Sequence, residues 1–261
     1  MLLVCNGMYR SGSTLQHKLV CRLIGARGSN VGFWTSEEVA TKHSRLSLMA
    51  KDQNIYILKT HSAIPRLPGS VRIIYSHRDL RDVAVSLYSK LECSQEVMLS
   101  LLDECVDVYK SNIDSPAGCI LVQSYELLTS DLESCVQQLA HFLGIDLSAR
   151  EMELLAKEYS IDSVSKQVGK ESGIRATIVG LNRRFNFGRK LKTAGVPSSW
   201  TSYMRRVVQG EGDGSSFHFN HISKHRGRSG VWRDALDSRD AEIINKKYGT
   251  WLATMGYFEG G

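Results

Sequence analysis

The chain has 261 residues, of which 42% are hydrophobic and 23% charged, a balance typical of a soluble globular protein. No run approaches the roughly 20 apolar residues of a membrane span, and the apolar run at the start is too short for a secretory signal. We therefore expect a cytoplasmic protein with no membrane partner. The six cysteines form no Cys-x-x-Cys pair, which favours buried reduced thiols over disulfides or a zinc site.

Short β-prone runs alternate with segments of helical periodicity. The strands are predicted at residues 2–5, 55–58, 71–76 and 119–122. The helices are predicted at residues 15–24, 80–88, 98–109, 131–143, 149–159 and 237–255. Residues 28–33 resemble a loop, and Thr35 or Ser36 could cap a further helix. This order predicts the α/β class, with one domain over residues 1–261 and a central parallel sheet flanked by helices.

Residues 172–222 interrupt this pattern, because they are rich in Gly, Ser, Arg and aromatic residues and have no sustained period. We expect an irregular lid or insertion here, since long connections are usually functional. Residues 172–230 carry eleven Lys and Arg against two acidic residues, a net charge of +9, whereas the whole chain carries +6. Such a block suits a polyanionic ligand, a nucleic acid or simply a solvated surface.

The first predicted strand runs into a polar turn and then into a helix, which is a P-loop-like arrangement. Gly12 lets the backbone approach an anion closely and adopt a positive φ. Ser13 and Thr14 fall near the helix N-terminus, where free N–H groups attract anions. Arg10 adds a permanent cation. Taken alone, the motif also fits an ordinary helix cap.

Two later strands end in polar side chains. Lys59 and His61 follow the second predicted strand, and Arg78 follows the third, with Ser86 on the next helix. Because the carboxyl ends of parallel strands meet at one edge of a sheet, these residues should converge with the first loop. Such a set suits a ligand that has two anionic groups and a proton to transfer.

These motifs resemble the sulfotransferases that use 3′-phosphoadenosine 5′-phosphosulfate (PAPS), in particular a small, bacterial-like member. The first loop matches the family form [KR]-S-G-[TS]-[TS]. The resemblance implies that this loop cradles the phosphosulfate through Arg10, Ser11, Gly12, Ser13 and Thr14. It also implies that Arg78 and Ser86, within an Arg-x-x-x-Asp-x-x-x-Ser pattern, grip the 3′-phosphate.

Two further motifs resemble the family's cofactor contacts. One is Tyr125 followed by Glu126, and the other is the loop that begins Arg226-Gly227 and ends at Trp232. Leu15 stands where many members have an aromatic residue that stacks on adenine.

The resemblance implies in-line transfer of a sulfuryl group from PAPS, which leaves the product PAP. His61 would act as general base with a pKa suited to neutral pH. Lys59 and Arg10 would neutralise developing charge. No metal is needed, and the eight histidines show no metal-ligand spacing.

The acceptor is expected to be a small polar molecule with a hydroxyl or amine group, because the candidate acceptor loops carry charge. These loops comprise Phe33, Trp34, Glu37, Glu38 and residues 172–222. If Glu37 or Glu38 faces the pocket, a cationic natural product becomes the favoured acceptor, whereas an acidic polysaccharide would suit the basic block. A homodimer is a candidate assembly, and no nucleic-acid partner is expected.

Two other functions are each compatible with part of the sequence. A P-loop kinase would need G-x-x-x-x-G-K-[ST], and the chain has Gly7 and Gly12 at that spacing but lacks the lysine. A non-catalytic nucleic-acid binder would explain the basic block, but the block holds no recognisable binding motif. Sulfuryl transfer without Mg²⁺ would separate the sulfotransferase from both.

Overall fold

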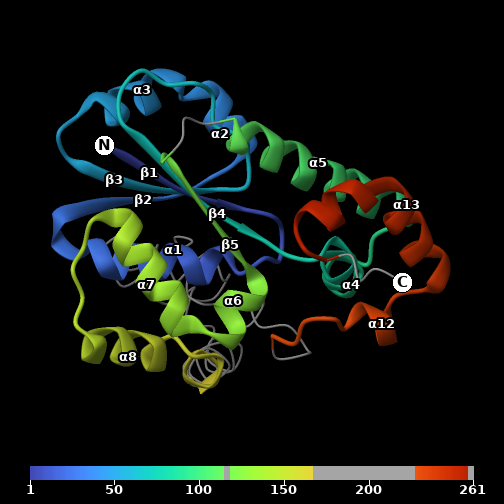
Figure 1. Cartoon of the computed structure of the whole chain (residues 1–261). Coiled ribbons are helices and arrows are strands. Elements are labelled where there is room, and N and C mark those ends of the chain that lie inside the picture. The colour runs from blue at the N-terminus through green and yellow to red at the C-terminus, as the bar shows by residue number, and fades with distance from the viewer. Residues whose placement is uncertain (115–117, 167–226, 258–261) are drawn as a thin grey trace, which may run out of the picture.

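The computed structural model describes residues 1–114, 118–166 and 227–257 (Figure 1). The predicted lid at residues 172–222 and the predicted cofactor contact Arg226 lie outside these residues. Within them, no helix is both long and apolar enough to cross a membrane. All six cysteines are free thiols, but only Cys5, Cys105 and Cys135 are buried as predicted, and the other three are partly exposed.

The core of the fold is a five-stranded sheet in which every pair of neighbours is parallel, in the order β2-β3-β1-β4-β5. The strands are β1 (Leu2–Gly7), β2 (Gly28–Trp34), β3 (Ile55–Thr60), β4 (Val71–His77) and β5 (Ile120–Ser124). β1 lies in the middle, with Cys5 opposite Lys59 of β3 and Gly7 opposite Ser76 of β4. The prediction of a parallel α/β sheet is confirmed.

Helices cover both faces of this sheet (Figure 1). The helices of one layer are α1 (Ser13–Ile24), α6 (Tyr125–Ser130), α7 (Leu132–Leu143) and α8 (Ala149–Glu158). The helices of the other layer are α2 (Ser36–Thr41), α3 (His43–Lys51), α4 (Leu80–Leu91), α5 (Gln95–Ile113) and α13 (Ser238–Thr254). A short 3-10 turn, η1 (Gly25–Arg27), follows α1, and the short helix α12 (Trp232–Ala235) lies against α4.

The side chains of β1 pack alternately against the two helix layers. Leu2 and Val4 join the core beneath α3, α4, α5 and α13, whereas Leu3 and Cys5 join the core beneath α1 and α7. All four side chains are fully buried. This alternation is the period of two that a strand imposes, and burial on both faces is typical of a parallel sheet.

The sequence prediction was wrong at residues 28–33, which form most of β2 rather than a loop. This edge strand contains two glycines and polar residues and is largely exposed, so it lacks the apolar signal of a buried strand. Its pairing with β3 is also irregular between Asn30 and Gly32. The prediction of a capped helix was right, and the cap is Thr35, which exchanges hydrogen bonds with Glu38.

Leu58 of β3 tests how far the sheet depends on its buried side chains. We expect Leu58→Ala to lower the free energy of unfolding by about 2–5 kcal/mol, because it opens a cavity at a fully buried position. The same change at Leu48, which is 68% exposed on α3, should cost less than about 0.5 kcal/mol. Urea denaturation of both variants measures the difference, and equal losses would contradict the assignment of the core.

Candidate active site

The loop between β1 and α1 is held tightly against the end of β4. A Cβ atom on Gly7 would lie 2.2 Å from Ser76 Oγ, so only glycine fits there. Met8 N donates to Ser76 O at 3.0 Å, and Ser11 Oγ donates to Met8 O at 2.8 Å. Ser11 is fully buried by these contacts. It therefore shapes the loop from inside rather than lining a pocket.

The N-terminus of α1 is open to an anion. Its N-cap, Gly12, has a left-handed φ of 82° and offers no side chain to the helix. The first turn holds no acidic residue, and Ser13 and Thr14 line a pocket at this point. The free N–H groups and the positive end of the helix dipole therefore face that pocket without a competing carboxylate on the helix itself.

Lys59 supplies a cation to the same place. It stands near the carboxyl end of β3, is only 5% exposed, and donates from Nζ to Thr14 Oγ1 at 2.6 Å. Burial lowers the pKa of Lys59 to about 8. The amine therefore remains mostly protonated at neutral pH, and a nearby anion would stabilise its charge further.

His61 lies just beyond Lys59, with Nδ1 2.7 Å from the carbonyl oxygen of Gly7. A carbonyl oxygen only accepts, so Nδ1 carries the proton and Nε2 is left as an acceptor. Burial, aided by the charges of Lys59 and Arg10, lowers the pKa of His61 to about 4. This pKa is below the near-neutral one expected from the sequence, so His61 is a neutral base throughout the physiological range.

Two aromatic rings border His61. The ring centroid of Tyr9 lies 5.0 Å from that of His61, and the ring centroid of Phe33 lies 5.8 Å away. Phe33 is 40% exposed, so this side of the histidine faces outward.

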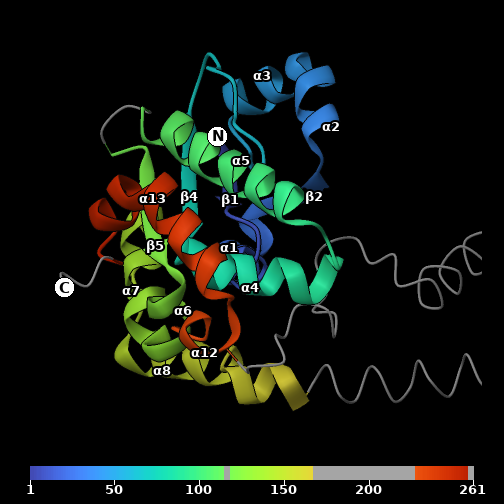
Figure 2. The ribbon, with the colours of Figure 1, turned by 90° about the vertical axis from the view of Figure 1, so that its right-hand side faces the viewer.

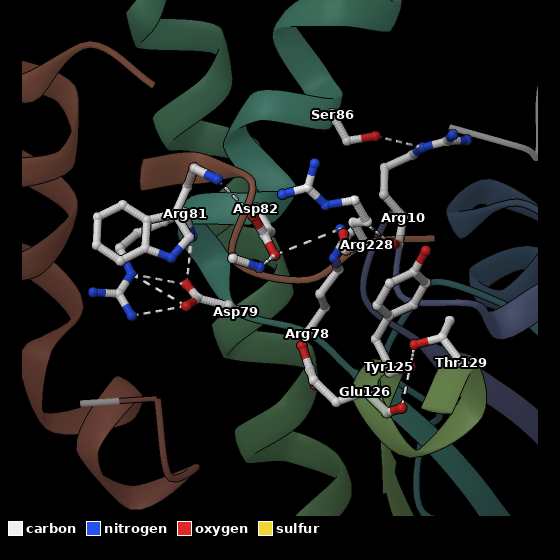
Figure 3. Close-up of polar contacts among 12 residues, drawn as sticks. Arg10, Arg78, Asp79, Arg81, Asp82, Ser86, Tyr125, Glu126, Thr129 and Arg228 are labelled. Carbon is white, nitrogen blue, oxygen red and sulfur yellow. Dashed lines mark hydrogen bonds and ion pairs between the residues drawn. The ribbon is translucent and has the colours of Figure 1, made fainter. Parts of the chain in front are cut away.

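Arg10 and Arg78, which line the same pocket, form what we call the Arg78 wall (Figure 3). Arg10 Nε donates to Ser86 Oγ at 2.9 Å, and its main-chain carbonyl accepts from Arg78 Nη1 at 3.4 Å. Burial and the charge of Arg78 lower the pKa of Arg10. Arg78 is 4% exposed and stacks 3.9 Å above the ring of Tyr125. Its buried Nε has no hydrogen-bond partner within the described residues.

Asp82 ties the loop at residues 227–232 to this wall. Its carboxylate accepts from the backbone N–H of Gly230 at 2.7 Å and of Trp232 at 2.9 Å (Figure 3). Arg78 Nη2 lies 3.5 Å from the same carboxylate and donates to Arg228 O at 3.0 Å. Segments about 150 residues apart in the chain are thereby fixed side by side.

A pocket of about 270 Å³ collects most of the predicted site residues. The predicted residues that line it are Arg10, Gly12, Ser13, Thr14, Lys59, His61, Arg78, Tyr125 and Gly227. Ser11 and Ser86 stand behind this lining, and Arg226 lies outside the described residues. The convergence expected from the strand ends is confirmed.

Sequence reasoning missed the apolar end of this pocket. That end is lined by Leu15, Tyr159, Ile161 and Val164, with Thr129 beside them. Three of these residues follow the end of α8, where no motif marks them. Within the described part of the chain, no cluster of three or more His, Cys, Asp or Glu could hold a metal ion.

The fold is that of a P-loop-like sulfotransferase. The family model described as "Sulfotransferase domain" matches residues 3–210, and the chain belongs to this family. No curated protein matches the chain by sequence.

Three solved structures share the fold. Retinol dehydratase with androsterone and the inactive cofactor PAP has a TM-score of 0.56 at 16% identity, and retinol dehydratase with retinol and PAP has 0.54 at 19%. Both matches cover 96% of this chain and 80% of the other. Mouse sulfotransferase SULT7A1 with PAP has a TM-score of 0.55 at 15% identity, covering 96% of this chain and 84% of the other.

The protonation state of His61 can be measured directly. We expect its ring nitrogens in NMR spectra to show the neutral Nδ1–H form at pH 6 and a transition near pH 4. The unfolded chain binds this proton near pH 6.5, so the free energy of unfolding should fall as the pH drops from about 6.5 toward 4. His61→Asn should lack that part of the pH dependence. A His61 resonance that titrates near pH 6.5 would contradict the buried environment.

Proposed function

We propose that this sulfotransferase moves a sulfuryl group from PAPS to a hydroxyl or amine group of a small-molecule acceptor. The observation that carries the proposal is the meeting of Lys59, the neutral base His61 and the open N-terminus of α1 in one pocket. The relatives in fold support PAPS as the donor, because their structures contain PAP. We treat residues 1–261 as one domain of this function.

The residues present fit a ligand with two phosphate positions. At one position are the loop backbone of Gly12, Ser13 and Thr14 together with Lys59, which suit the phosphosulfate. At the other are Arg78, whose buried Nε lacks a partner among the described residues, and Ser86 behind Arg10. An unpartnered buried guanidinium N–H is costly, so an anion there would restore a lost hydrogen bond.

The apolar end of the pocket suits the adenosine. Leu15, Ile161 and Val164 offer flat aliphatic contact, and the ring of Tyr159 lies with them. In this chain the adenine would thus rest on side chains from after α8 as well as on Leu15. Gly227 closes this end with a φ of 82° and no room for a side chain, since a Cβ would lie 2.5 Å from Ile161 Cδ1.

PAPS, when bound, supplies the sulfuryl group, whose sulfur exchanges its bond to the phosphate oxygen for one to the acceptor. His61 Nε2 takes the acceptor's proton, because Nδ1 is already protonated and bonded to Gly7. Lys59 and the N–H groups of α1 stabilise the negative charge that grows on the leaving oxygen. Protonated His61 is electrostatically disfavoured beside Lys59, so it releases the proton readily after transfer.

We propose a small polar acceptor that binds on the open side of His61. The relatives in fold bind small molecules, namely retinol and androsterone. For a cationic natural product, the ring of Tyr9 offers a cation–π contact, whereas Lys59 Nζ already lies over the ring of Phe33, 5.7 Å from its centroid. Glu38 is less suited to that role, since its carboxylate already accepts from Lys42 and Thr35.

Removal of the proposed base tests the mechanism. His61→Ala should lower kcat by at least about 100-fold, the loss typical of a general base, while PAP affinity survives. The matched control is His141→Ala, a change at an exposed position of α7. Acceptor screening with labelled PAPS supplies the assay, and calorimetry gives PAP affinity. Retained turnover in the His61 variant would reject the base assignment.

A variant of Arg10 tests which phosphate of the nucleotide the first loop binds. Because Nε is bonded to Ser86, we expect the guanidinium to reach the 3′-phosphate position beside Arg78. Arg10→Lys should then weaken PAP binding by about tenfold, the scale of one charged hydrogen bond, and weaken adenosine 5′-phosphate binding much less. Arg45→Lys, at an exposed position of α3, is the control. Equal losses for both nucleotides would place Arg10 at the phosphosulfate instead.

A further inference from the structure

Tyr257 lies just after α13 and belongs to none of the motifs, yet it sits directly behind the Arg78 wall. Its hydroxyl donates to Glu126 Oε2 at 2.8 Å and lies 2.9 Å from His77 Nδ1. A carboxylate only accepts, so the hydroxyl proton points to Glu126 and His77 donates from Nδ1. The ring of Tyr257 stacks on Trp251 at 6.0 Å.

Glu126 is a partly buried carboxylate next to Tyr125, which lines the pocket. It follows Tyr125, whose ring carries the guanidinium of Arg78 at 3.9 Å. Burial raises the pKa of Glu126, while the Tyr257 hydroxyl and the charge of Arg78 act to lower it. The carboxylate is thus within the electrostatic reach of Arg78, but its Oε2 is held by Tyr257.

The other carboxylate near Arg78 is restrained in a different way. Asp82 pairs with Arg78 at 3.5 Å, but both of its oxygens also accept backbone N–H groups, from Gly230 and Trp232, so its charge is shared with the loop at residues 227–232. The Oε2 atom of Glu126 instead accepts the Tyr257 hydroxyl, so this carboxylate is held from the end of α13. Without the Tyr257 hydroxyl it would gain most by turning to Arg78, because a partly buried carboxylate needs a partner.

We propose that Tyr257 is a positioning residue for donor binding, which holds Glu126 away from Arg78 and so leaves that guanidinium available to the nucleotide's 3′-phosphate. This inference rests on the proposed function. A glutamate released onto Arg78 would compete with the phosphate for the same N–H groups. Tyr257 therefore acts through Glu126 and touches neither donor nor acceptor.

The main chain of Tyr257 makes a separate contact, so the hydroxyl can be removed while that contact stays in place. Its carbonyl oxygen accepts from Arg81 Nη2 at 2.7 Å, and Arg81 also pairs with Asp79 at 2.7 Å and stacks 3.9 Å from the Trp232 ring. These contacts join α13, α4 and α12, which lie together in Figure 2. Tyr257→Phe keeps the ring and this carbonyl and removes one oxygen.

The experiment compares Tyr257→Phe, Glu126→Gln and the double variant, with PAP affinity measured by calorimetry and KM for PAPS and kcat by the transfer assay. We expect Tyr257→Phe to weaken PAP binding by about tenfold, the scale of one charged hydrogen bond, and to raise KM for PAPS with kcat unchanged. The double variant should regain the original affinity, since a neutral amide cannot neutralise Arg78.

The matched control is Tyr248→Phe on α13. The Tyr248 hydroxyl also bonds to a carbonyl and a carboxylate, those of Leu99 and Asp103, but these lie on α5 away from the pocket. Tyr248→Phe should lower the stability of the protein without changing its affinity for PAP. Thermal melting of each variant shows that it is folded.

Two results would overturn the inference. One is unaltered PAP binding by Tyr257→Phe, and the other is a loss that Glu126→Gln fails to restore, as a purely structural role predicts. Glu126→Gln alone gives an independent check, because it should bind PAP at least as tightly as the unchanged chain. If the unchanged chain bound no PAP, the proposed function itself would fail.

Discussion

The structure depends on a concentration of buried positive charge at the carboxyl edge of the sheet. Lys59 and Arg78 are at least nine-tenths buried, Arg10 lies against Arg78, and the open end of α1 adds a partial positive charge. Burying charge is unfavourable: burial lowers the pKa of Lys59 to about 8, and burial together with the charge of Arg78 lowers the pKa of Arg10. An anionic ligand would lower this free-energy cost, so the buried positive charge favours the binding of polyanions.

Of the surrounding acidic groups, Asp82 pairs with Arg78 at 3.5 Å, but each of these groups is also bound to another segment. Asp79 pairs with Arg81, Asp82 accepts two backbone N–H groups, and Glu126 accepts the Tyr257 hydroxyl. Each carboxylate stabilises a neighbouring segment and has limited freedom to neutralise the pocket. The same contacts bring the loop at residues 227–232 and the end of α13 against α4, so folding of the later segments and assembly of the pocket are linked.

Burial and the same positive charges also set the protonation state of His61. Its position between Gly7, Lys59 and two aromatic rings keeps it neutral, with the proton fixed on Nδ1. A histidine with an ordinary pKa would be partly protonated at neutral pH, whereas this one presents Nε2 as a base throughout that range. In the proposed mechanism, burial and nearby cations therefore keep the base neutral, and the carbonyl of Gly7 orients its ring.

The sequence by itself determined the parallel sheet, the strand–loop–helix at residues 2–24 and the convergence of Lys59, His61 and Arg78, because short-range periodicity and the strand ends carry that information. Only the tertiary structure decided that Gly28–Trp34 pairs as an edge strand, that Tyr159 and Ile161 complete the pocket, and that Tyr257 reaches Glu126. It also set the low pKa of His61. These features arise from contacts between distant segments, such as Glu126 and Tyr257, which are 131 residues apart, and such packing leaves no periodic signal in the chain.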